Sequence, residues 1–201
     1  MRLFVVFEGG EGSGKSTQAR ALARKLMRLD MPVVLTHEPG GTALGNRLRR
    51  WVKWGEHITP QTELLFILAA RSQVVAGVIR PALERDCTVV CDRYMYSTIA
   101  YQGYGRGMDL ELLTRLNGLV TEGLVPDVVI YLDCGPEEGL KRKRGERDRF
   151  EREDGGFHSR VKDGYLRMAA ADPGRWFVVD ASLPRREIQG RIWERVLPLL
   201  R

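Results

Sequence analysis

The 201-residue sequence predicts an α/β fold in which a five-stranded, mostly parallel sheet is covered by helices on both sides. Three observations lead to this prediction. Five short runs are apolar on successive residues, which is typical of strands buried on both faces. Longer stretches with a helical period separate these runs, and such alternation indicates βαβ units. A glycine-rich loop follows the first run, where a parallel sheet commonly binds its ligand.

The elements are expected in a simple alternating order along the chain. The predicted strands are residues 3–7, 32–36, 88–91, 128–132 and 176–179. The predicted helices are residues 15–29, 43–52, 62–84, 110–122, 159–170 and 185–200. Neither a linker nor an internal repeat is visible, so we expect one domain over residues 1–201. Residues 141–156 are highly charged and interrupted by glycine, which predicts a mobile surface segment.

The charge of the chain indicates a polyanionic ligand. Lys and Arg number 32 against 26 Asp and Glu, giving a formal net charge of +6, and 43% of the residues are hydrophobic. The hydrophobic content excludes a disordered or fibrous protein. Much of the basic excess is concentrated in residues 141–149, so it predicts a local site for a ligand such as a nucleoside triphosphate, without a nucleic-acid partner.

The cysteines and the apolar segments predict a soluble, cytoplasmic protein. Cys87, Cys91 and Cys134 lack the CxxC spacing of a zinc site, so we expect free, buried thiols in a reducing compartment. The chain shows no basic start followed by an apolar signal segment. It also shows no apolar run of 18 residues that could span a bilayer, so no membrane partner is expected.

Residues 9–16, with the sequence GGEGSGKS, match the phosphate-loop pattern GxxxxGK[ST]. The loop directly follows the first predicted strand and opens the first predicted helix, which is the context that the pattern requires. Glycines allow backbone N–H groups to surround phosphate oxygens, Lys15 can reach the β and γ phosphates, and the Ser16 hydroxyl can bind Mg²⁺. The alternative, a glycine-rich turn before a helix, does not explain all eight positions. The loop therefore predicts binding of a nucleoside triphosphate.

Two further segments end predicted strands at the same edge of the sheet. Asp92 and Arg93 follow the third strand, where the carboxylate can hold a magnesium shell and the guanidinium can grip a phosphate. A simple ion pair at the strand end is the other interpretation. Residues 38–42, with the sequence EPGGT, follow the second strand, and their glycines would let the backbone approach an anion, although a plain turn is also compatible.

Taken together, these segments resemble the thymidylate kinase family. The similarity is carried, in order and at the spacing of the family, by residues 7–17, 38–42, 64–71, 92–94, 97–103, 126–133 and 148–151. It spans nearly the whole chain and is more specific than the phosphate loop alone. It implies a three-layer fold of the P-loop nucleoside monophosphate kinase type with a mobile lid at about residues 141–156. It also implies transfer of the γ-phosphoryl group of ATP to dTMP, giving dTDP, with Mg²⁺ as cofactor.

The resemblance assigns a role to each matching position. Glu11 would meet the 3′-hydroxyl of the sugar, Arg93 the acceptor phosphate, Arg71 the base or the phosphate, and Tyr101 the underside of the sugar. The residues implied for ATP are Gly9, Gly10, Glu11, Gly12, Ser13, Gly14, Lys15, Ser16, Thr17 and Arg142. Those implied for the acceptor are Glu11, Glu38, Pro39, Phe66, Ile67, Arg71, Arg93, Ser97, Thr98, Tyr101 and Gln102. Ser16 and Asp92 would hold the metal.

The catalytic arginines are expected in the lid. The phosphate loop carries no Arg or Lys before Lys15, which resembles the bacterial arrangement of the family. The lid would close over both nucleotides, supply positive charge to the phosphoryl group and exclude water. The candidates are Arg142, Arg144, Arg147 and Arg149, beside the catalytic roles implied for Lys15, Asp92 and Arg93; a solvated charged loop is the alternative.

The base pocket departs from the pattern of the family. In the family an aromatic ring that stacks on thymine lies four residues before the helix arginine, but Ile67 occupies that position and Phe66 lies five before Arg71. Either the helix is locally wound so that Phe66 turns inward, or the base packs on Ile67 and loses a stacking contact of roughly 1 kcal/mol or more. His37 and Ile99 are smaller departures. The same reaction on a 5-modified dUMP, such as 5-hydroxymethyl-dUMP, is therefore an alternative.

Two further functions remain open from the sequence. A deoxynucleoside kinase shares the phosphate loop and an Asp-Arg strand end, but it needs no sites for an anionic acceptor such as Arg71 and Arg93. A phosphate-loop ATPase or switch would need a positioned water and an output surface. The resemblance also implies a homodimer, with helices packing around residues 62–84 and from Ser97 onward.

Overall fold

The five apolar runs form one parallel sheet in the computed structural model, which describes residues 2–142 and 146–200. The strands are β1 (Phe4–Gly9), β2 (Val33–His37), β3 (Thr88–Asp92), β4 (Val128–Asp133) and β5 (Trp176–Asp180). Their order across the sheet is β2-β3-β1-β4-β5, and each neighbouring pair is parallel. The predicted α/β class and the five-stranded parallel sheet are confirmed.

The helices lie where the helical periodicity predicts them, with short additions between. The α-helices are α1 (Lys15–Met27), α2 (Ala43–Trp54), α3 (Pro60–Val74), α4 (Arg80–Glu84), α5 (Met95–Thr98), α6 (Leu110–Thr121), α7 (Pro136–Arg142), α8 (Gly155–Ala171) and α9 (Arg185–Val196). A π-helical stretch, Val75–Ile79, joins α3 to α4, and a second one, Ile99–Gly105, extends α5. A 3-10 turn, Leu197–Leu199, follows α9.

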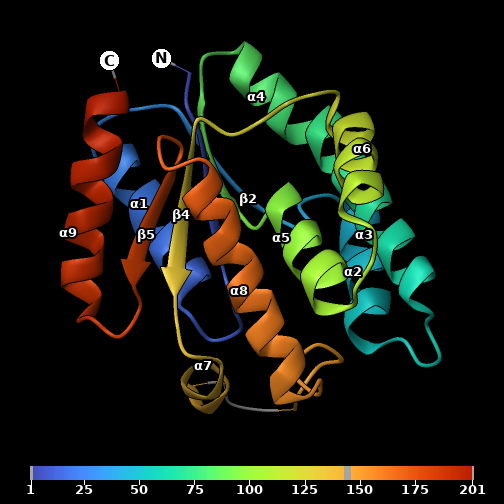
Figure 1. Cartoon of the computed structure of the whole chain (residues 1–201). Coiled ribbons are helices and arrows are strands. Elements are labelled where there is room, and N and C mark those ends of the chain that lie inside the picture. The colour runs from blue at the N-terminus through green and yellow to red at the C-terminus, as the bar shows by residue number, and fades with distance from the viewer. Residues whose placement is uncertain (1, 143–145, 201) are drawn as a thin grey trace.

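The sheet buries apolar side chains on both faces. On one face, Val5 and Phe7 of β1 pack in a cluster with residues of α1 and α9. On the other, Phe4 and Val6 pack with the helices from α3 to α4, and Tyr131 of β4 packs with α8. Figure 1 shows α1 and α9 on one side of the strands and α3, α5 and α8 on the other. The result is three layers, as the alternating pattern of the sequence predicts.

The parallel register brings the chemically important strand ends together. In β1, Phe7 pairs with Asp92 of β3 and with Ile130 of β4. The carboxyl ends of β1 and β3 therefore meet at one edge, which places the phosphate loop beside Asp92 and Arg93. This is the edge at which parallel sheets bind ligands.

The two edge strands are less buried than the apolar runs indicate. Leu35 of β2 is 39% exposed and Val178 of β5 is 46% exposed. The prediction that all five strands are buried on both faces is therefore wrong for β2 and β5. Both lie at the margins of the sheet, where a helix covers an outer strand only in part.

The segment of residues 141–156 is not uniformly a mobile surface loop. Residues 141 and 142 end helix α7, and α8 begins at Gly155. Asp148 and Glu151 are only 2% and 4% exposed, and the Asp148 carboxylate accepts hydrogen bonds from the backbone N–H groups of Phe150 and Glu151. The expectation is therefore wrong for residues 148–151, which form a buried turn.

One stretch meets the length and composition criteria of a membrane span, contrary to the expectation from the sequence. It is the continuous helical stretch Pro60–Glu84, whose 18-residue apolar window is 50% buried within the fold. Core helices of soluble proteins pass the same test, and here the stretch packs on the sheet and carries the buried charged residues Glu63 and Arg71.

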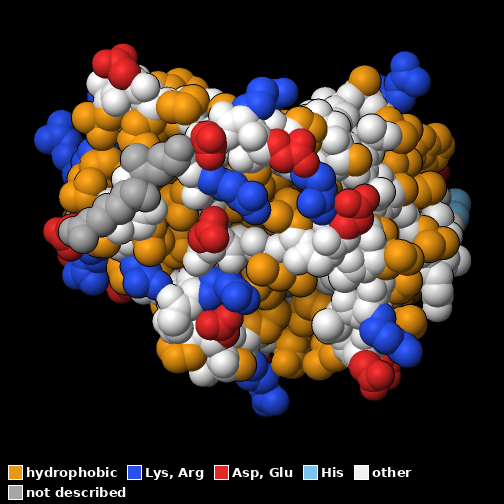
Figure 2. All heavy atoms as spheres, turned by 90° about the horizontal axis from the view of Figure 1, so that it is seen from above, with side chains coloured by type: hydrophobic (Ala, Val, Ile, Leu, Met, Phe, Trp, Pro, Cys, Tyr) orange, Lys and Arg blue, Asp and Glu red, His pale blue; other side chains and the backbone are white. Residues whose placement is uncertain are grey.

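Charged side chains of both signs alternate on the face that Figure 2 shows. Lys and Arg lie beside Asp and Glu there, with hydrophobic side chains between them, and no continuous basic surface is visible on that face. The positive charge that matters for a ligand is found in the cavity described next.

Candidate active site

A cavity of about 370 Å³ opens at the carboxyl ends of β1 and β3. This volume is in the range of sites for small molecules and cofactors. Most of the residues predicted to bind nucleotides line it: Glu11, Gly12, Gly14, Lys15, Ser16, Thr17, Glu38, Pro39, Ile67, Arg71, Asp92, Arg93, Ser97, Thr98, Tyr101, Gln102 and Arg142. Gly9, Gly10, Ser13, Phe66, Arg147 and Arg149 do not line it.

Glycines shape the phosphate loop and dock it onto α7. Gly14, at the N-terminal cap of α1, has φ of 93°, a left-handed conformation that side chains rarely adopt. At Gly12, with φ of 67°, a Cβ atom would lie 1.8 Å from the carbonyl oxygen of Gly139. Two glycine backbones therefore meet here, and this close contact brings α7, with Arg142 at its end, against the loop.

Lys15 lies inside the loop rather than at its surface. Its Nζ donates to the carbonyl oxygen of Gly10 at 2.5 Å and to the Ser13 hydroxyl at 3.2 Å. Burial, aided by the nearby Arg93 charge, lowers the pKa of Lys15 to about 8. An anionic ligand would favour the charged ammonium, so phosphate binding and the positive charge on Lys15 reinforce each other.

Ser16 and Asp92 form the part of the site that suits a magnesium ion. The Ser16 hydroxyl donates to Asp92 Oδ2, while the buried Asp92 Oδ1 has no hydrogen-bond partner among the described residues. A carboxylate and a hydroxyl fit Mg²⁺, which commonly takes one or two protein oxygens and completes its shell with phosphates and water. Across residues 2–142 and 146–200, no group of three or more His, Cys, Asp or Glu side chains could hold a metal on its own. A metal here would therefore depend on the oxygens of a bound nucleotide.

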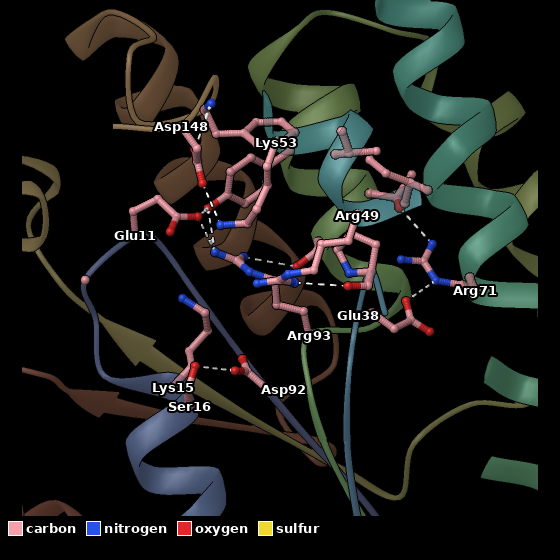
Figure 3. Close-up of a pocket in the computed structure, with 18 of the residues that line it drawn as sticks. Glu11, Lys15, Ser16, Glu38, Arg49, Lys53, Arg71, Asp92, Arg93 and Asp148 are labelled. Carbon is pink, nitrogen blue, oxygen red and sulfur yellow. Dashed lines mark hydrogen bonds and ion pairs between the residues drawn. The ribbon is translucent and has the colours of Figure 1, made fainter. Parts of the chain in front are cut away.

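Arg93 lies at the centre of the cavity (Figure 3). Its φ of 71° is left-handed, and such a conformation at a non-glycine residue is often found at functional sites. Its Nη2 contacts Glu11 Oε1 at 2.5 Å and the Tyr101 hydroxyl at 3.1 Å, and its Nη1 donates to the Gly9 carbonyl oxygen at 3.1 Å. Burial lowers the pKa of Arg93, but Tyr101 and Glu11 together raise it well above its ordinary value. The guanidinium is therefore permanently charged.

Glu8, which the sequence analysis missed, supports the turn that carries Arg93. Its buried carboxylate accepts from the backbone N–H groups of Tyr94 and Ser97, at 3.0 and 3.1 Å, and from the hydroxyls of Ser97 and Tyr165, at 2.6 and 2.8 Å. Burial raises the pKa of Glu8, whereas the Arg93 charge lowers it. The signal in the sequence was a single carboxylate inside an otherwise apolar strand.

Arg49 of α2 is a cation in the cavity that the sequence analysis also missed. Its Nη1 donates to the Pro39 carbonyl oxygen at 3.0 Å, and burial together with the Arg93 charge lowers its pKa. Figure 3 shows its side chain reaching toward Arg93. Helical spacing could have indicated it, because Arg49, Val52 and Lys53 share one face of α2 and all three line the cavity.

Arg71 is fixed at the other end of the cavity. It is 1% exposed, and its Nε donates to Glu38 Oε2 at 2.6 Å. Its Nη1 donates to the Thr98 hydroxyl at 2.7 Å and to Asn117 Oδ1 at 2.6 Å. Burial raises the pKa of Glu38 to about 7, although the Arg71 charge opposes the rise. Helices α3, α5 and α6 and the loop after β2 thus meet at one guanidinium, at the position where the resemblance implies the base.

The helix places Ile67, not Phe66, on the wall of the cavity. Ile67 is 7% exposed and lines the cavity, while the half-buried Phe66 packs against the apolar cluster beside it. Helix α3 is a regular α-helix over this region, because the π-helical stretch begins only at Val75. Of the two arrangements considered from the sequence, the structure has the one in which the aliphatic side chain of Ile67 faces the base pocket. Phe150, to which the sequence analysis assigned no role, also lines the cavity.

The predicted lid arginines lie in different places. Arg142 lines the cavity, with its Nη1 donating to the Ala181 carbonyl oxygen at 2.9 Å and its Nη2 bonded to Glu138. Arg147 is exposed and lies away from the cavity. Arg149 turns toward the end of α2, where it donates to the carbonyl oxygens of Val52 and Ile58. Arg144 lies outside the described residues.

A second contact joins the predicted lid to α2. Lys53 Nζ lies 2.6 Å from Asp148 Oδ2, and both side chains line the cavity. The backbone N–H of Arg149 also donates to the Lys53 carbonyl oxygen at 3.0 Å. These bonds fix the C-terminal part of the predicted lid, residues 141–156, to α2, while Arg142 lies near the N-terminal end of that segment.

Comparison with known proteins gives a consistent result. The family model described as thymidylate kinase matches residues 7–192. A thymidylate kinase of Dehalococcoides mccartyi strain CBDB1 is 52% identical over 100% of this chain and 98% of its own length. One of Thermomicrobium roseum is 44% identical over 100% of this chain and 97% of its own length. The crystal structure of a thymidylate kinase from Ehrlichia chaffeensis superposes with a TM-score of 0.82, with 34% identity over 97% of this chain and 98% of that one.

Proposed function

Since the chain belongs to the thymidylate kinase family and phosphorylates dTMP, we propose that the γ-phosphoryl group of ATP is transferred in the cavity at the ends of β1 and β3. The observation that carries this proposal is the continuity of one cavity from Lys15 of the phosphate loop, past Arg93, to Arg71. A cavity with a phosphate loop at one end and Arg93 and Arg71 further along suits two anionic nucleotides held end to end. The relatives give no support to a 5-modified dUMP as the preferred acceptor.

The donor occupies the phosphate-loop end. The loop backbone and Lys15 hold the β and γ phosphates of ATP at the N-terminus of α1, where the unpaired N–H groups favour an anion. Arg142, which α7 places against the loop, adds positive charge from the lid side. Thr17 follows Ser16 into the helix and completes this end of the cavity.

The acceptor occupies the other end. Arg93 and Arg49 hold the phosphate of dTMP, with Glu11 and Tyr101 close to its sugar and Arg71, Thr98 and Gln102 close to its base. Pro39 and Ile67 supply apolar contact. Because Glu11 already pairs with Arg93, an incoming phosphate shares the guanidinium with this carboxylate, and the pair connects the phosphate site to the sugar site.

The reaction depends on positioning and on neutralisation of charge. Arg93 and Lys15 bring the acceptor oxygen and the γ-phosphorus into line, and the lid closes with Arg142 to exclude water. Ser16 and Asp92 would hold an ion of Mg²⁺, which would supply positive charge against the negative charge that develops during the transfer. The buried Asp92 Oδ1, which has no hydrogen-bond partner in the described part of the chain, supports this assignment.

We further propose that the enzyme is a cytoplasmic homodimer formed through α3 and α6. These helices lie side by side in Figure 1. They expose Leu65 (62%), Leu112 (44%) and Leu119 (73%), an apolar surface that a second copy could bury. Light scattering after gel filtration tests this, because Leu119→Asp should yield a monomer if the surface is the interface. A wild-type monomer would contradict the dimer.

A coupled assay of ADP release tests the function directly. ATP and magnesium are supplied with dTMP, dUMP, 5-hydroxymethyl-dUMP, the ribose counterpart of dTMP, or thymidine. Highest kcat/KM for dTMP is the expected result. Preference for 5-hydroxymethyl-dUMP would show that a modified deoxyuridylate is the preferred acceptor. Preference for thymidine would indicate a nucleoside kinase, and ADP release without any acceptor would indicate an ATPase.

A further inference from the structure

The amide of Gln102 leaves one hydrogen-bonding atom without a partner at the base end of the cavity. Gln102 belongs to the π-helical stretch Ile99–Gly105, lines the cavity and is 1% exposed. Its Nε2 donates to Glu63 Oε1 at 2.9 Å, whereas its buried Oε1 has no partner among the described residues. An unpaired buried acceptor destabilises the folded protein, because it has lost its hydrogen bonds to water. A ligand that brings an N–H donor to this oxygen would recover that loss.

The partner of the amide nitrogen determines which way the amide faces. A carboxylate can only accept hydrogen bonds, so Glu63 must meet the NH₂ group of Gln102 and cannot meet its oxygen. With the reverse orientation, two acceptor oxygens would face each other in a buried site. The exposed fraction of Glu63 is 0%, so water cannot relieve such a contact.

Two arginines hold the Glu63 carboxylate in place. Arg106 binds it with two parallel bonds, Nε to Oε1 at 2.7 Å and Nη2 to Oε2 at 2.8 Å. Arg149 adds a third contact, Nη2 to Oε2 at 3.2 Å. Bidentate pairing fixes both the charge and the plane of a carboxylate. Glu63 is therefore a rigid acceptor that reaches no ligand itself but sets the orientation of an amide that lines the cavity.

We propose that Glu63 is a positioning residue for base selection, acting through the amide of Gln102. This inference rests on the proposed function. With the amide fixed, Gln102 Oε1 accepts a hydrogen bond from the N3–H group of thymine. Cytosine carries a lone pair at N3 in place of this N–H, so it would bring an acceptor to an acceptor. A site that pairs with a polar group discriminates strongly against an analogue that lacks it.

The test compares kcat/KM for dTMP, dUMP and dCMP. Glu63→Gln keeps the shape but adds an NH₂ donor, so the Gln102 amide can turn over. We expect the dTMP-to-dCMP ratio to fall about ten-fold or more, while the dTMP-to-dUMP ratio stays unchanged, because uracil also carries N3–H. Glu63→Asp remains an acceptor only and should retain most of the discrimination, although it disturbs packing. Glu153→Gln is the matched control, since Glu153 binds the same Arg106, at 2.8 Å, while the described hydrogen bond of the Gln102 amide goes to Glu63.

Each outcome decides the proposal. A wild-type dTMP-to-dCMP ratio in Glu63→Gln overturns it, as does an equal loss in Glu63→Gln, Glu63→Asp and Glu153→Gln, which would indicate a purely structural role. If Glu63→Gln does not fold, Gln102→Leu replaces it, and an unchanged ratio there overturns the proposal. Failure of the wild-type protein to phosphorylate dTMP would instead contradict the proposed function. The same assay therefore distinguishes failure of the proposed function from failure of the proposal for Glu63.

Discussion

Arg93 Nη2 lies 2.5 Å from Glu11 Oε1, which links the end of β3 to the phosphate loop across the floor of the cavity. Each side chain is 15% exposed, so the pair is shielded from solvent on most sides but open toward the cavity. The two residues are 82 positions apart in the chain, and the parallel pairing of β1 with β3 brings them together. The contact orients a fixed positive charge toward the space where donor and acceptor phosphates would meet.

Arg93→Lys should lower kcat/KM for dTMP by about 100-fold or more. Lysine keeps the charge but loses the planar fork that bonds Glu11, Tyr101 and the Gly9 carbonyl oxygen at once. Steady-state kinetics measures the effect, and circular dichroism checks the fold. A variant within a few-fold of wild type would show that charge alone suffices.

Ile67→Ala should raise KM for dTMP several-fold, because it removes apolar contact from the wall of the cavity. Phe66→Leu is the matched control, since Phe66 lies beside the wall without lining it. We expect Phe66→Leu to lower the melting temperature while leaving KM for dTMP close to wild type. The opposite pattern would mean that Phe66 turns inward when the base binds.

Arg142→Gln and Arg149→Gln should affect different properties. Arg142 lines the cavity, so its loss should lower kcat by about ten-fold or more with little change in melting temperature. Arg149 contacts Glu63 and α2, so its loss should lower the free energy of unfolding by about 1–3 kcal/mol. Urea unfolding and kcat for both variants separate the two roles, and a larger fall in kcat for Arg149→Gln would reverse the assignment.

The stability contributed by Glu38 should fall as pH rises from about 4.5 to about 7. Burial raises the pKa of this carboxyl from 4.5 to about 7, so over that range the folded protein binds a proton that the unfolded chain has released. Bound protons favour the state that holds them, so the stabilisation by the Glu38 carboxyl is fully present below pH 4.5 and is lost as the pH rises through 7. Relative to Glu38→Gln, the wild type should lose at most about 3 kcal/mol. Urea unfolding at several pH values measures this difference, and a constant difference would contradict it.

Removal of magnesium should abolish phosphoryl transfer, and Asp92→Asn should raise the magnesium concentration needed for half-maximal rate. The amide keeps one oxygen but loses the negative charge that a divalent cation favours. Titration of MgCl₂ at fixed ATP, with EDTA as the zero point, measures the shift. A wild-type magnesium dependence in the Asp92→Asn variant would place the ion elsewhere.

The fold was predictable from the sequence to within a few residues per element. The runs at residues 3–7 and 128–132 are apolar on successive residues because central strands are covered on both faces, and they became β1 and β4. The prediction of full burial failed for β2 and β5, since a linear pattern does not reveal which strands lie at the edges. Short α5 and α7 were also missed, because four to seven residues are too few to show a helical period.

The candidate site was predictable only where consecutive residues carry the chemistry. The phosphate loop is one continuous segment, so its glycines, Lys15 and Ser16 could be recognised together. Arg49 was missed although it shares one helix face with Val52 and Lys53, because the sequence does not show which face of α2 meets the cavity. Arg149 was expected among the catalytic arginines, but in the structure it bonds to Glu63 and to the end of α2. These contacts join segments that are far apart in the chain, so no local sequence pattern could predict them.

By itself the sequence determined the order of strands and helices, the phosphate loop and the resemblance to a kinase family, because these depend on local periodicity and short motifs. Only the tertiary structure decided that Arg93 meets Glu11, that Ile67 and not Phe66 faces the cavity, and that Glu63 accepts a hydrogen bond from the amide nitrogen of Gln102. These relationships depend on strand register, helix rotation and burial. Such quantities arise when elements far apart in the chain pack against one another and exclude water.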